Sequence, residues 1–189
     1  MENIIEGKRL TRAFICLEFP DEVIKEVARV QESLRNKMFT GKFTELENLH
    51  LTLKFLGEID DNMIGKVKEK LKEIKFASFR CSLGLSGTFS MRGNPRIVWI
   101  KLNGEGIWNL QKKIDSALQE LFRPEERFMS HLTIARVKYV KDKKAFVEYV
   151  KKINVKEIKF DADCFKLKSS DLKMNGPVYK EIEKYKNTI

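Results

Sequence analysis

The two histidines of this 189-residue sequence, His50 and His131, are each followed two residues later by a threonine, Thr52 and Thr133. An imidazole titrates near neutral pH, so a pair of imidazoles can supply a general base and a general acid. Threonine hydroxyls can donate hydrogen bonds to phosphate oxygens and stabilise the negative charge that develops there. The repeated pattern therefore indicates acid–base chemistry on a phosphate, with the histidines as catalytic residues and the threonines as phosphate-binding residues.

Alternative uses of the histidines fit the sequence less well. A lone histidine on a strand is more often a packed residue than a catalytic one, but residues 48–54 recur in similar form as residues 129–135. The chain contains no Cys-x-x-Cys and no His-Glu-x-x-His pattern, and no ligand spacing supports a zinc site. We therefore expect a reaction that uses no metal and no cofactor.

Each His-x-Thr pattern lies on a segment that the sequence predicts to be a strand. Successive side chains of a strand point to opposite faces, so the histidine and the threonine share one face and apolar residues share the other. By the same alternation Lys54 shares the face of His50 and Thr52, where it adds positive charge near the phosphate or is simply solvated.

The remaining patterns predict an α+β protein. One helix opens at residues 20–22, with Asp21 as its cap, and a second opens at residues 60–62; two more cover residues 104–122 and 142–153. Several strand pairs have no helix between them, which favours antiparallel sheets. The repeat then predicts a single domain, residues 1–189, built of two interleaved, pseudo-duplicated lobes around a central cleft. The predicted strands are residues 12–19, 49–56 (ended by Gly57), 79–89, 97–102, 128–137, 158–172 and 178–185.

The composition narrows the class of partner. Lys and Arg number 37 against 27 Asp and Glu, a net charge of +10, which favours RNA, DNA, a phosphorylated ligand or an anionic surface. The alternative is a solvated surface rich in ion pairs. No apolar run reaches the roughly 18 residues of a membrane span, and the acidic N-terminus does not resemble a signal peptide. Three widely spaced cysteines favour reduced thiols, so we expect a cytoplasmic protein. Because no membrane span is predicted, we also expect that it does not bind membranes.

The segments 50–57 and 130–136 resemble the two signature motifs of the two-histidine phosphoesterase superfamily. Within it the chain is most similar to the LigT/ThpR group, the RNA 2′,3′-cyclic phosphodiesterases that are also called 2′-5′ RNA ligases. Residues 12–20 resemble the opening strand of that group, residues 97–100 its Val-Trp strand, and residues 169–170 with 176–179 its closing segment. The resemblance covers about residues 12–185.

The resemblance implies two antiparallel sheets that line a basic cleft, and metal-independent hydrolysis of RNA 2′,3′-cyclic phosphate ends to 2′-phosphates. One histidine activates water and the other protonates the departing 3′-oxygen. The sequence does not order them; we favour His131 as the base and His50 as the acid. Reversal, with a 5′-hydroxyl in place of water, gives 2′-5′ ligation. The implied partner is RNA with such an end, tRNA fragments included, and a monomeric protein is expected.

Two further residues take a role from the resemblance, which places Arg136 and Phe14 against the nucleobase. Strict alternation puts Arg136 on the face opposite His131, so this role requires the strand to twist or end there; a surface arginine and a core phenylalanine are the alternatives. Two other functions stay open: a phosphodiesterase for a small cyclic phosphate such as ADP-ribose 1″,2″-cyclic phosphate, and a non-catalytic RNA-binding module. The duplicated His-x-Thr pattern argues against the latter, because Arg, Lys and aromatic residues suffice for binding.

Overall fold

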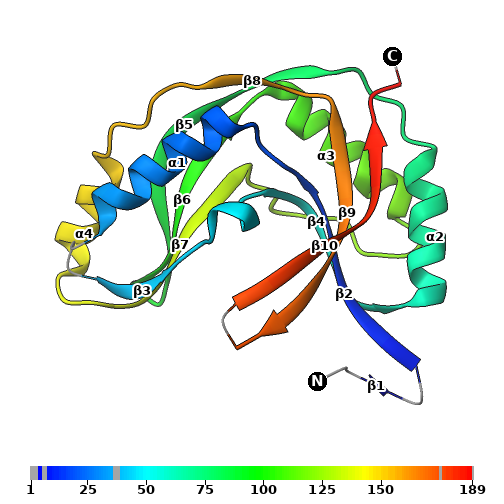
Figure 1. Ribbon diagram of the computed structural model, residues 1–189, viewed down its shortest axis with the longest axis horizontal. Helices are drawn as coiled ribbons and strands as arrows, with labels where there is room; N and C mark the ends of the chain where they lie inside the picture. The colour runs from blue at the N-terminus through cyan, green and yellow to red at the C-terminus, as the bar shows by residue number, and fades with distance from the viewer. Residues whose placement is uncertain (1–3, 6–7, 36–38, 175, 189) are drawn as a thin grey trace.

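The computed structural model describes residues 4–5, 8–35, 39–174 and 176–188, and these form two antiparallel sheets with helices at their outer sides (Figure 1). The predicted α+β class is confirmed. The first sheet runs in the order β1-β2-β9-β10, with β4 also paired to β2, and the second in the order β3-β7-β6-β5-β8. The strands of the first sheet are β1 (Ile4–Ile5), β2 (Lys8–Leu17), β4 (Leu51–Asp60), β9 (Cys164–Lys173) and β10 (Gly176–Lys186). Those of the second are β3 (Phe39–Phe43), β5 (Phe79–Met91), β6 (Asn94–Asn103), β7 (His131–Val140) and β8 (Lys159–Ala162).

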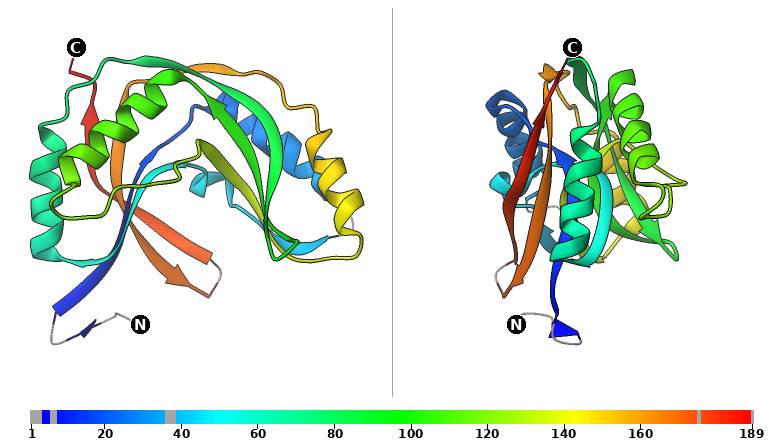
Figure 2. Two further views of the ribbon diagram at one scale, coloured as in Figure 1. Left: turned by 180° about the vertical axis from the view of Figure 1, so that it is seen from behind. Right: turned by 90° about the vertical axis from the view of Figure 1, so that its right-hand side faces the viewer.

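The chain crosses between the two halves more than once. Helix α1 (Asp21–Leu34) follows β2 of the first sheet but packs against β7 of the second, beside which α4 (Lys143–Lys151) covers β5 and β6. Helix α3 (Glu105–Leu118) follows β6 of the second sheet and packs against β4 of the first, next to α2 (Asp61–Lys72). Figure 2 shows the same arrangement from behind and from the side. Each motif strand is therefore held by a helix that the other half of the chain supplies.

The helices follow from the apolar spacing of the sequence. In α1, Val23, Val27, Val30 and Leu34 are buried at intervals of three and four residues, the spacing of one helix face. The helix α2 begins where it was predicted, and the side chain of Asp60 caps it by accepting a hydrogen bond of 2.8 Å from the backbone amide of residue 63. In the described ranges, no helix is long and apolar enough to cross a membrane.

The structure corrects several predicted boundaries. Asp21 does not cap α1; Pro20 occupies the cap position, and Asp21 lies in the first turn. Gly57 does not end its strand, because β4 continues to Asp60. The φ of Gly57 is 77°, and it lies at a shift of register against β2, so the glycine marks a β-bulge within the strand.

The predicted strand 158–172 is two strands in different sheets. Residue Asp163 separates β8, at the edge of the second sheet, from β9, in the middle of the first. A break of one residue leaves the apolar run nearly continuous, so the sequence pattern does not reveal it. The short strand β3 and the 3₁₀ turn Leu46–Asn48 were also missed, and both lie in the segment that leads to His50.

Candidate functional site

A cleft of about 460 Å³ lies between the two sheets, and both His-x-Thr patterns line it. His50 precedes the first residue of β4, and His131 is the first residue of β7, so the two motif strands bring their leading ends to the same place. Thr52 and Thr133 line the cleft beside them. The structure therefore brings together the four residues on which the sequence-based hypothesis depends.

The two imidazoles are held in the same way. Nδ1 of His50 donates to the carbonyl of Asn48, and Nδ1 of His131 donates to the carbonyl of Met129, each over 2.7 Å. A carbonyl oxygen can only accept, so Nδ1 carries the proton in both rings. Nε2 is thus the atom of each histidine that is left to exchange protons in the cleft.

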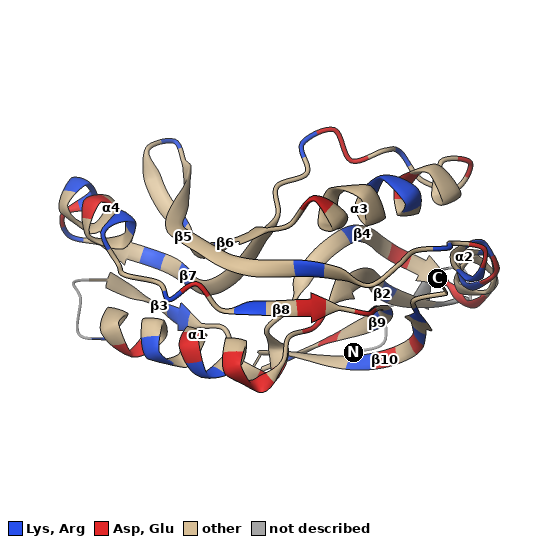
Figure 3. Cartoon of the chain, turned by 90° about the horizontal axis from the view of Figure 1, so that it is seen from above, with Lys and Arg blue, Asp and Glu red and all other residues tan. Residues whose placement is uncertain are grey.

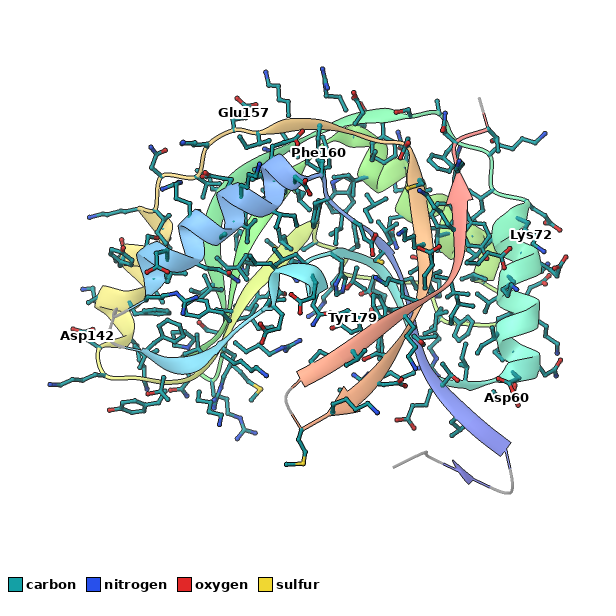
Figure 4. All side chains as sticks on the ribbon, in the orientation of Figure 1. Asp60, Lys72, Asp142, Glu157, Phe160 and Tyr179 are labelled. Carbon is teal, nitrogen blue, oxygen red and sulfur yellow. The ribbon has the colours of Figure 1, made fainter. Side chains whose placement is uncertain are left out.

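Aromatic rings fix the position of His50. Its imidazole lies 4.8 Å from the ring of Phe14 and 5.2 Å from that of Tyr179, centroid to centroid, and the phenylalanine and tyrosine rings contact each other edge to face. Figure 4 labels Tyr179 on β10 in the middle of the molecule. Nε2 of His50 lies 3.1 Å from Oγ1 of Thr52, which can donate to it. This imidazole therefore contacts two aromatic rings and is hydrogen-bonded at both nitrogens.

Burial changes the acidity of the two ionisable groups in this cluster. It lowers the pKa of His50, an effect that the carbonyl of Asn48 opposes and the positive charge of Lys168 reinforces. Burial also raises the pKa of Tyr179, so its phenol keeps its proton at neutral pH. In the free protein His50 is therefore a neutral imidazole near pH 7, beside the ring of a protonated tyrosine.

His131 has a different support. The ring of Phe89 meets it edge-on at 4.9 Å, and Phe89 packs in turn against Trp99 at 5.4 Å. Gly87 leaves room for the indole, because a Cβ at this position would come within 2.4 Å of the Trp99 ring. No hydrogen bond of the kind seen in the first half joins the described side chains of His131 and Thr133. Among the described residues, the second imidazole thus has fewer aromatic contacts than the first.

A β-bulge changes the face of Lys54. Thr52 pairs with Cys16 of β2 but Lys54 pairs with Ile15, so Leu53 is an extra residue that shifts the alternation by one. Lys54 is consequently turned away from the cleft and is 4% exposed. The predicted face of Lys54 was wrong because strict alternation does not hold across a bulge. The residue that faces the cleft after Thr52 is Phe55.

The buried lysine has a defined partner. Its ammonium forms an ion pair with Asp115 of α3 and donates to the carbonyl of Arg123 over 2.8 Å. Burial alone would raise the pKa of Asp115, but hydrogen bonds from Lys54, from the backbone amide of Glu125 and from Gln111 hold it below the usual value. Lys54 therefore anchors the first motif strand to α3 and to the segment that leads toward His131.

A bulge at the matching place turns Arg136 into the cleft. Thr133 pairs with Trp99 of β6 and Ala135 with Val98, so Ile134 is the extra residue. Ile134 and Ala135 are both buried, and Arg136 lines the same cleft as His131. The expected conflict between alternation and a binding role for Arg136 is thus resolved by the bulge.

Phe14 was predicted to contact the nucleobase, whereas no role was predicted for the cleft residues Arg12, Phe55 and Lys42. Phe14 lines the cleft but is 3% exposed, so this ring mainly supports His50. Arg12 lies two residues earlier on β2, and its guanidinium lies over the ring of Phe55 at 4.8 Å. Lys42 of β3 also lines the cleft. The period of two along β2 could have revealed Arg12, whereas Phe55 and Lys42 depend on a bulge and on a strand that the sequence pattern did not show.

Positive charge dominates the lining. Arg12, Lys42 and Arg136 supply cations, and Glu45 is the carboxylate among the described lining residues. Elsewhere both signs of charge are mixed along α1, α2 and α4 (Figure 3). Within the part of the chain that the structure describes, no group of three or more His, Cys, Asp or Glu residues could hold a metal ion.

Comparisons with known proteins agree with this arrangement. A family model described as LigT like Phosphoesterase matches residues 17–99 and 101–179. A protein of Methanocaldococcus jannaschii named RNA 2′,3′-cyclic phosphodiesterase is 34% identical over 177 residues, which are 92% of this chain and 99% of that protein. A protein of the same name from Thermotoga maritima is 34% identical over 89% of this chain and 91% of its own.

Solved structures give the same result for the fold. The crystal structure of TT0787 of Thermus thermophilus matches with a TM-score of 0.79 and 26% identity, over 93% of this chain and 97% of that one. The structure of E. coli LigT complexed with 3′-AMP matches with a TM-score of 0.76 at 19% identity, over 95% and 99% of the two chains.

Proposed function

The chain belongs to the LigT-like phosphoesterase family, and we propose that it hydrolyses RNA 2′,3′-cyclic phosphate ends to 2′-phosphates without a metal ion. The observation that carries this proposal is the convergence of two imidazoles, each with Nδ1 tied to a carbonyl and Nε2 left for proton transfer, on one cationic cleft. A cyclic phosphodiester is an anion, which the arginine side chains of the cleft attract. Relatives that carry the name RNA 2′,3′-cyclic phosphodiesterase support the choice of substrate.

The reaction follows from the two Nε2 atoms. His131 takes a proton from water as the water oxygen attacks phosphorus opposite the 3′-oxygen. The bond between phosphorus and the 3′-oxygen breaks, and His50 gives its Nε2 proton to that oxygen, leaving a 3′-hydroxyl and a 2′-phosphate. The hydroxyls of Thr52 and Thr133 donate to the non-bridging oxygens, where negative charge grows in the transition state.

The lowered pKa of His50 is compatible with a general acid that becomes protonated when the substrate binds. In the free protein the neutral ring accepts from Thr52. When the phosphate anion enters, its negative charge favours the protonated imidazole, and the threonine hydroxyl turns to the phosphate. The proton needed by the leaving oxygen then stands next to it.

Arg136 contacts the nucleobase that carries the cyclic phosphate in this proposal. Its guanidinium faces the cleft because of the bulge in β7, and it has no ion-pair partner among the described residues. A planar guanidinium can stack on any nucleobase, which makes the contact tolerant of sequence. The buried ring of Phe14 contributes by holding His50 in place.

The proposal extends to the setting of the reaction. The reverse reaction, attack by a 5′-hydroxyl, gives a 2′-5′ linkage from the same groups, and tRNA fragments with cyclic ends belong to the substrate class.

We also propose a monomeric protein in the cytoplasm, where Cys16, Cys81 and Cys164, which form no disulfide, would stay reduced. Burial raises the pKa of Cys16 to about 12, so this thiol stays protonated and unreactive.

An oligonucleotide with a 2′,3′-cyclic phosphate end tests the proposal directly. Incubation with the protein in EDTA should give a 2′-phosphate product, identified by mass and by comparison with synthetic 2′- and 3′-phosphate standards. A 3′-phosphate product would contradict the assignment of the leaving oxygen. Activity that is lost in EDTA and restored by a divalent ion would contradict the metal-independent mechanism.

A further inference from the structure

The cleft has a second flat surface that the proposed reaction does not use. Phe55 lies on its wall and is 49% exposed, whereas Leu53, Lys54 and Leu56 next to it on β4 are buried. A half-exposed phenyl ring leaves apolar area in contact with water, which a ligand with a flat apolar face can cover. Phe55 is therefore placed to bind rather than to pack in the core.

The guanidinium of Arg12 makes this surface more specific. It lies over the Phe55 ring at 4.8 Å, so the two side chains form a layered pair on the wall of the cleft. A stacked pair of guanidinium and aromatic ring matches the shape and the polarisability of a nucleobase. The positive charge of the guanidinium also matches the negative charge of the adjoining phosphate.

The position of the pair follows from the repeat. Phe55 comes three residues after Thr52, and Arg136 comes three residues after Thr133, each beyond a bulge at the intervening position. The two side chains therefore reach the same cleft from the two sheets. Arg136 is already assigned to the terminal nucleobase in the proposed function. The RNA chain that carries this nucleobase must leave the cleft, and its penultimate nucleotide then lies near the reacting phosphate.

We propose that Arg12 and Phe55 form a stacking subsite for the nucleobase of the penultimate nucleotide, so that the cleft reads two nucleotides of the RNA end. This inference rests on the proposed function and names the length of RNA that the site prefers. Recognition is tolerant of base identity, because every nucleobase offers a flat face to an aromatic ring.

The test is the ratio of kcat/KM for a dinucleotide with a 2′,3′-cyclic phosphate end to kcat/KM for the matching mononucleoside 2′,3′-cyclic phosphate. We expect the ratio to be about tenfold in favour of the dinucleotide, the size of one stacking contact. Phe55→Ala and Arg12→Ala should each bring it close to one, and Phe55→Trp should keep it. Leu85→Ala, which truncates an exposed side chain of β5 outside the cleft, is the matched control and should keep the wild-type ratio.

A third substrate identifies what is bound. A dinucleotide with an abasic penultimate residue keeps the internucleotide phosphate but has no base to stack, so the wild-type preference should disappear with it. A preference that survives base removal, or a ratio that Phe55→Ala leaves unchanged, would overturn the stacking subsite. Failure to hydrolyse either cyclic phosphate would instead contradict the proposed function, so the two failures are distinguishable.

Discussion

The two His-x-Thr segments, at the start of β4 and of β7, share the residues proposed to be catalytic and differ in the residues around them. In β4 the imidazole is packed by Phe14 and Tyr179 and bonded to Thr52. Among the described residues, the imidazole of β7 has one aromatic contact, with the edge of Phe89, and no hydrogen bond to Thr133. The position after each bulge is a buried lysine in β4 and a buried alanine in β7, and the cleft position after that is Phe55 in one strand and Arg136 in the other.

This difference separates two kinds of constraint. Both strands must present an imidazole whose Nδ1 is tied to a carbonyl and a hydroxyl two residues later, because attack and departure at one phosphorus need a base and an acid. In the proposed reaction the positions beyond the bulges bind the substrate and do not react with it, so they are free to diverge. The halves are thus equivalent in the groups they offer to phosphorus and distinct in what they hold next to it.

Removing an imidazole gives the largest expected effect and tests the equivalence of the halves. His50→Ala and His131→Ala should each lower kcat on a cyclic-phosphate oligonucleotide by about 10³-fold, the range of general acid–base catalysis. Single-turnover assays with saturating enzyme measure this, and thermal unfolding checks that the variants are folded. Near-native turnover by either variant would show that one half suffices.

The buried ion pair of Lys54 with Asp115 is a further difference between the two motif strands. Lys54→Met leaves Asp115 partly buried without its cation and should lower the free energy of unfolding by about 3 kcal/mol, as for other broken buried pairs. Arg136→Met is the control on the other strand and should change it by less than about 1 kcal/mol, because this arginine has no such pair among the described residues. Urea unfolding compares them. If Lys54→Met were as stable as the wild type and had a raised KM for RNA, Lys54 would instead bind the substrate in the cleft.

The two threonines are expected to contribute equally to kcat but differently to the pKa of the neighbouring histidine. Thr52→Val and Thr133→Val should each lower kcat by about a hundredfold, since each removes a donor to the transition state. Thr52→Val should also shift the pH–rate profile, because it removes the hydroxyl that stabilises the neutral form of His50, and the pKa of this histidine should rise. Equal pH profiles for the two variants would remove this distinction between the halves.

Arg136 gives a smaller effect on binding. Arg136→Gln should raise KM about tenfold and leave kcat nearly unchanged, because a stacking contact is worth roughly that factor. The rise should be smaller at high salt, where the charge of the guanidinium is screened. A loss confined to kcat would place Arg136 at the reacting phosphate instead of the nucleobase.

The smallest effect is on stability in acid. The pKa of His50 is lower in the folded protein than the ordinary value near 6.5. As the pH falls through that range the unfolded chain takes up the proton first, so folding stability is lost as the pH falls. His50→Gln should therefore flatten the fall in unfolding free energy between about pH 7 and pH 5. An unchanged pH dependence of unfolding in His50→Gln would contradict the burial of a neutral imidazole at this position.

Much of this site could be predicted from the sequence, because it depends on the two-residue alternation of side chains within a strand. The two-residue spacing of His50 with Thr52, and of His131 with Thr133, survives in the structure, since each pair precedes the bulge of its strand. Beyond the bulges the period fails, and the failure misplaced Lys54. A bulge depends on the partner strand, here β2 and β6, and the single sequence does not carry the register of that pairing.

The same reason explains the fold. Helices with regular apolar spacing, such as α1 and α3, were predicted because their signal is local. The division of one apolar run at Asp163 between two sheets, and the crossing of α1 and α3 to the opposite half, depend on contacts distant in sequence. The cleft residues Arg12, Lys42 and Phe55 lie where those distant contacts decide the face of a strand.

One measurement tests the complementary roles of the two halves most directly. In a substrate whose 3′ bridging oxygen is replaced by sulfur, the leaving thiolate needs no proton, so general-acid catalysis is dispensable while general-base catalysis is not. His50→Ala should recover most of its lost rate on this substrate relative to the oxygen substrate, and His131→Ala should recover none. Equal recovery by both variants, or recovery by His131→Ala alone, would contradict the assignment of His50 as the acid and His131 as the base.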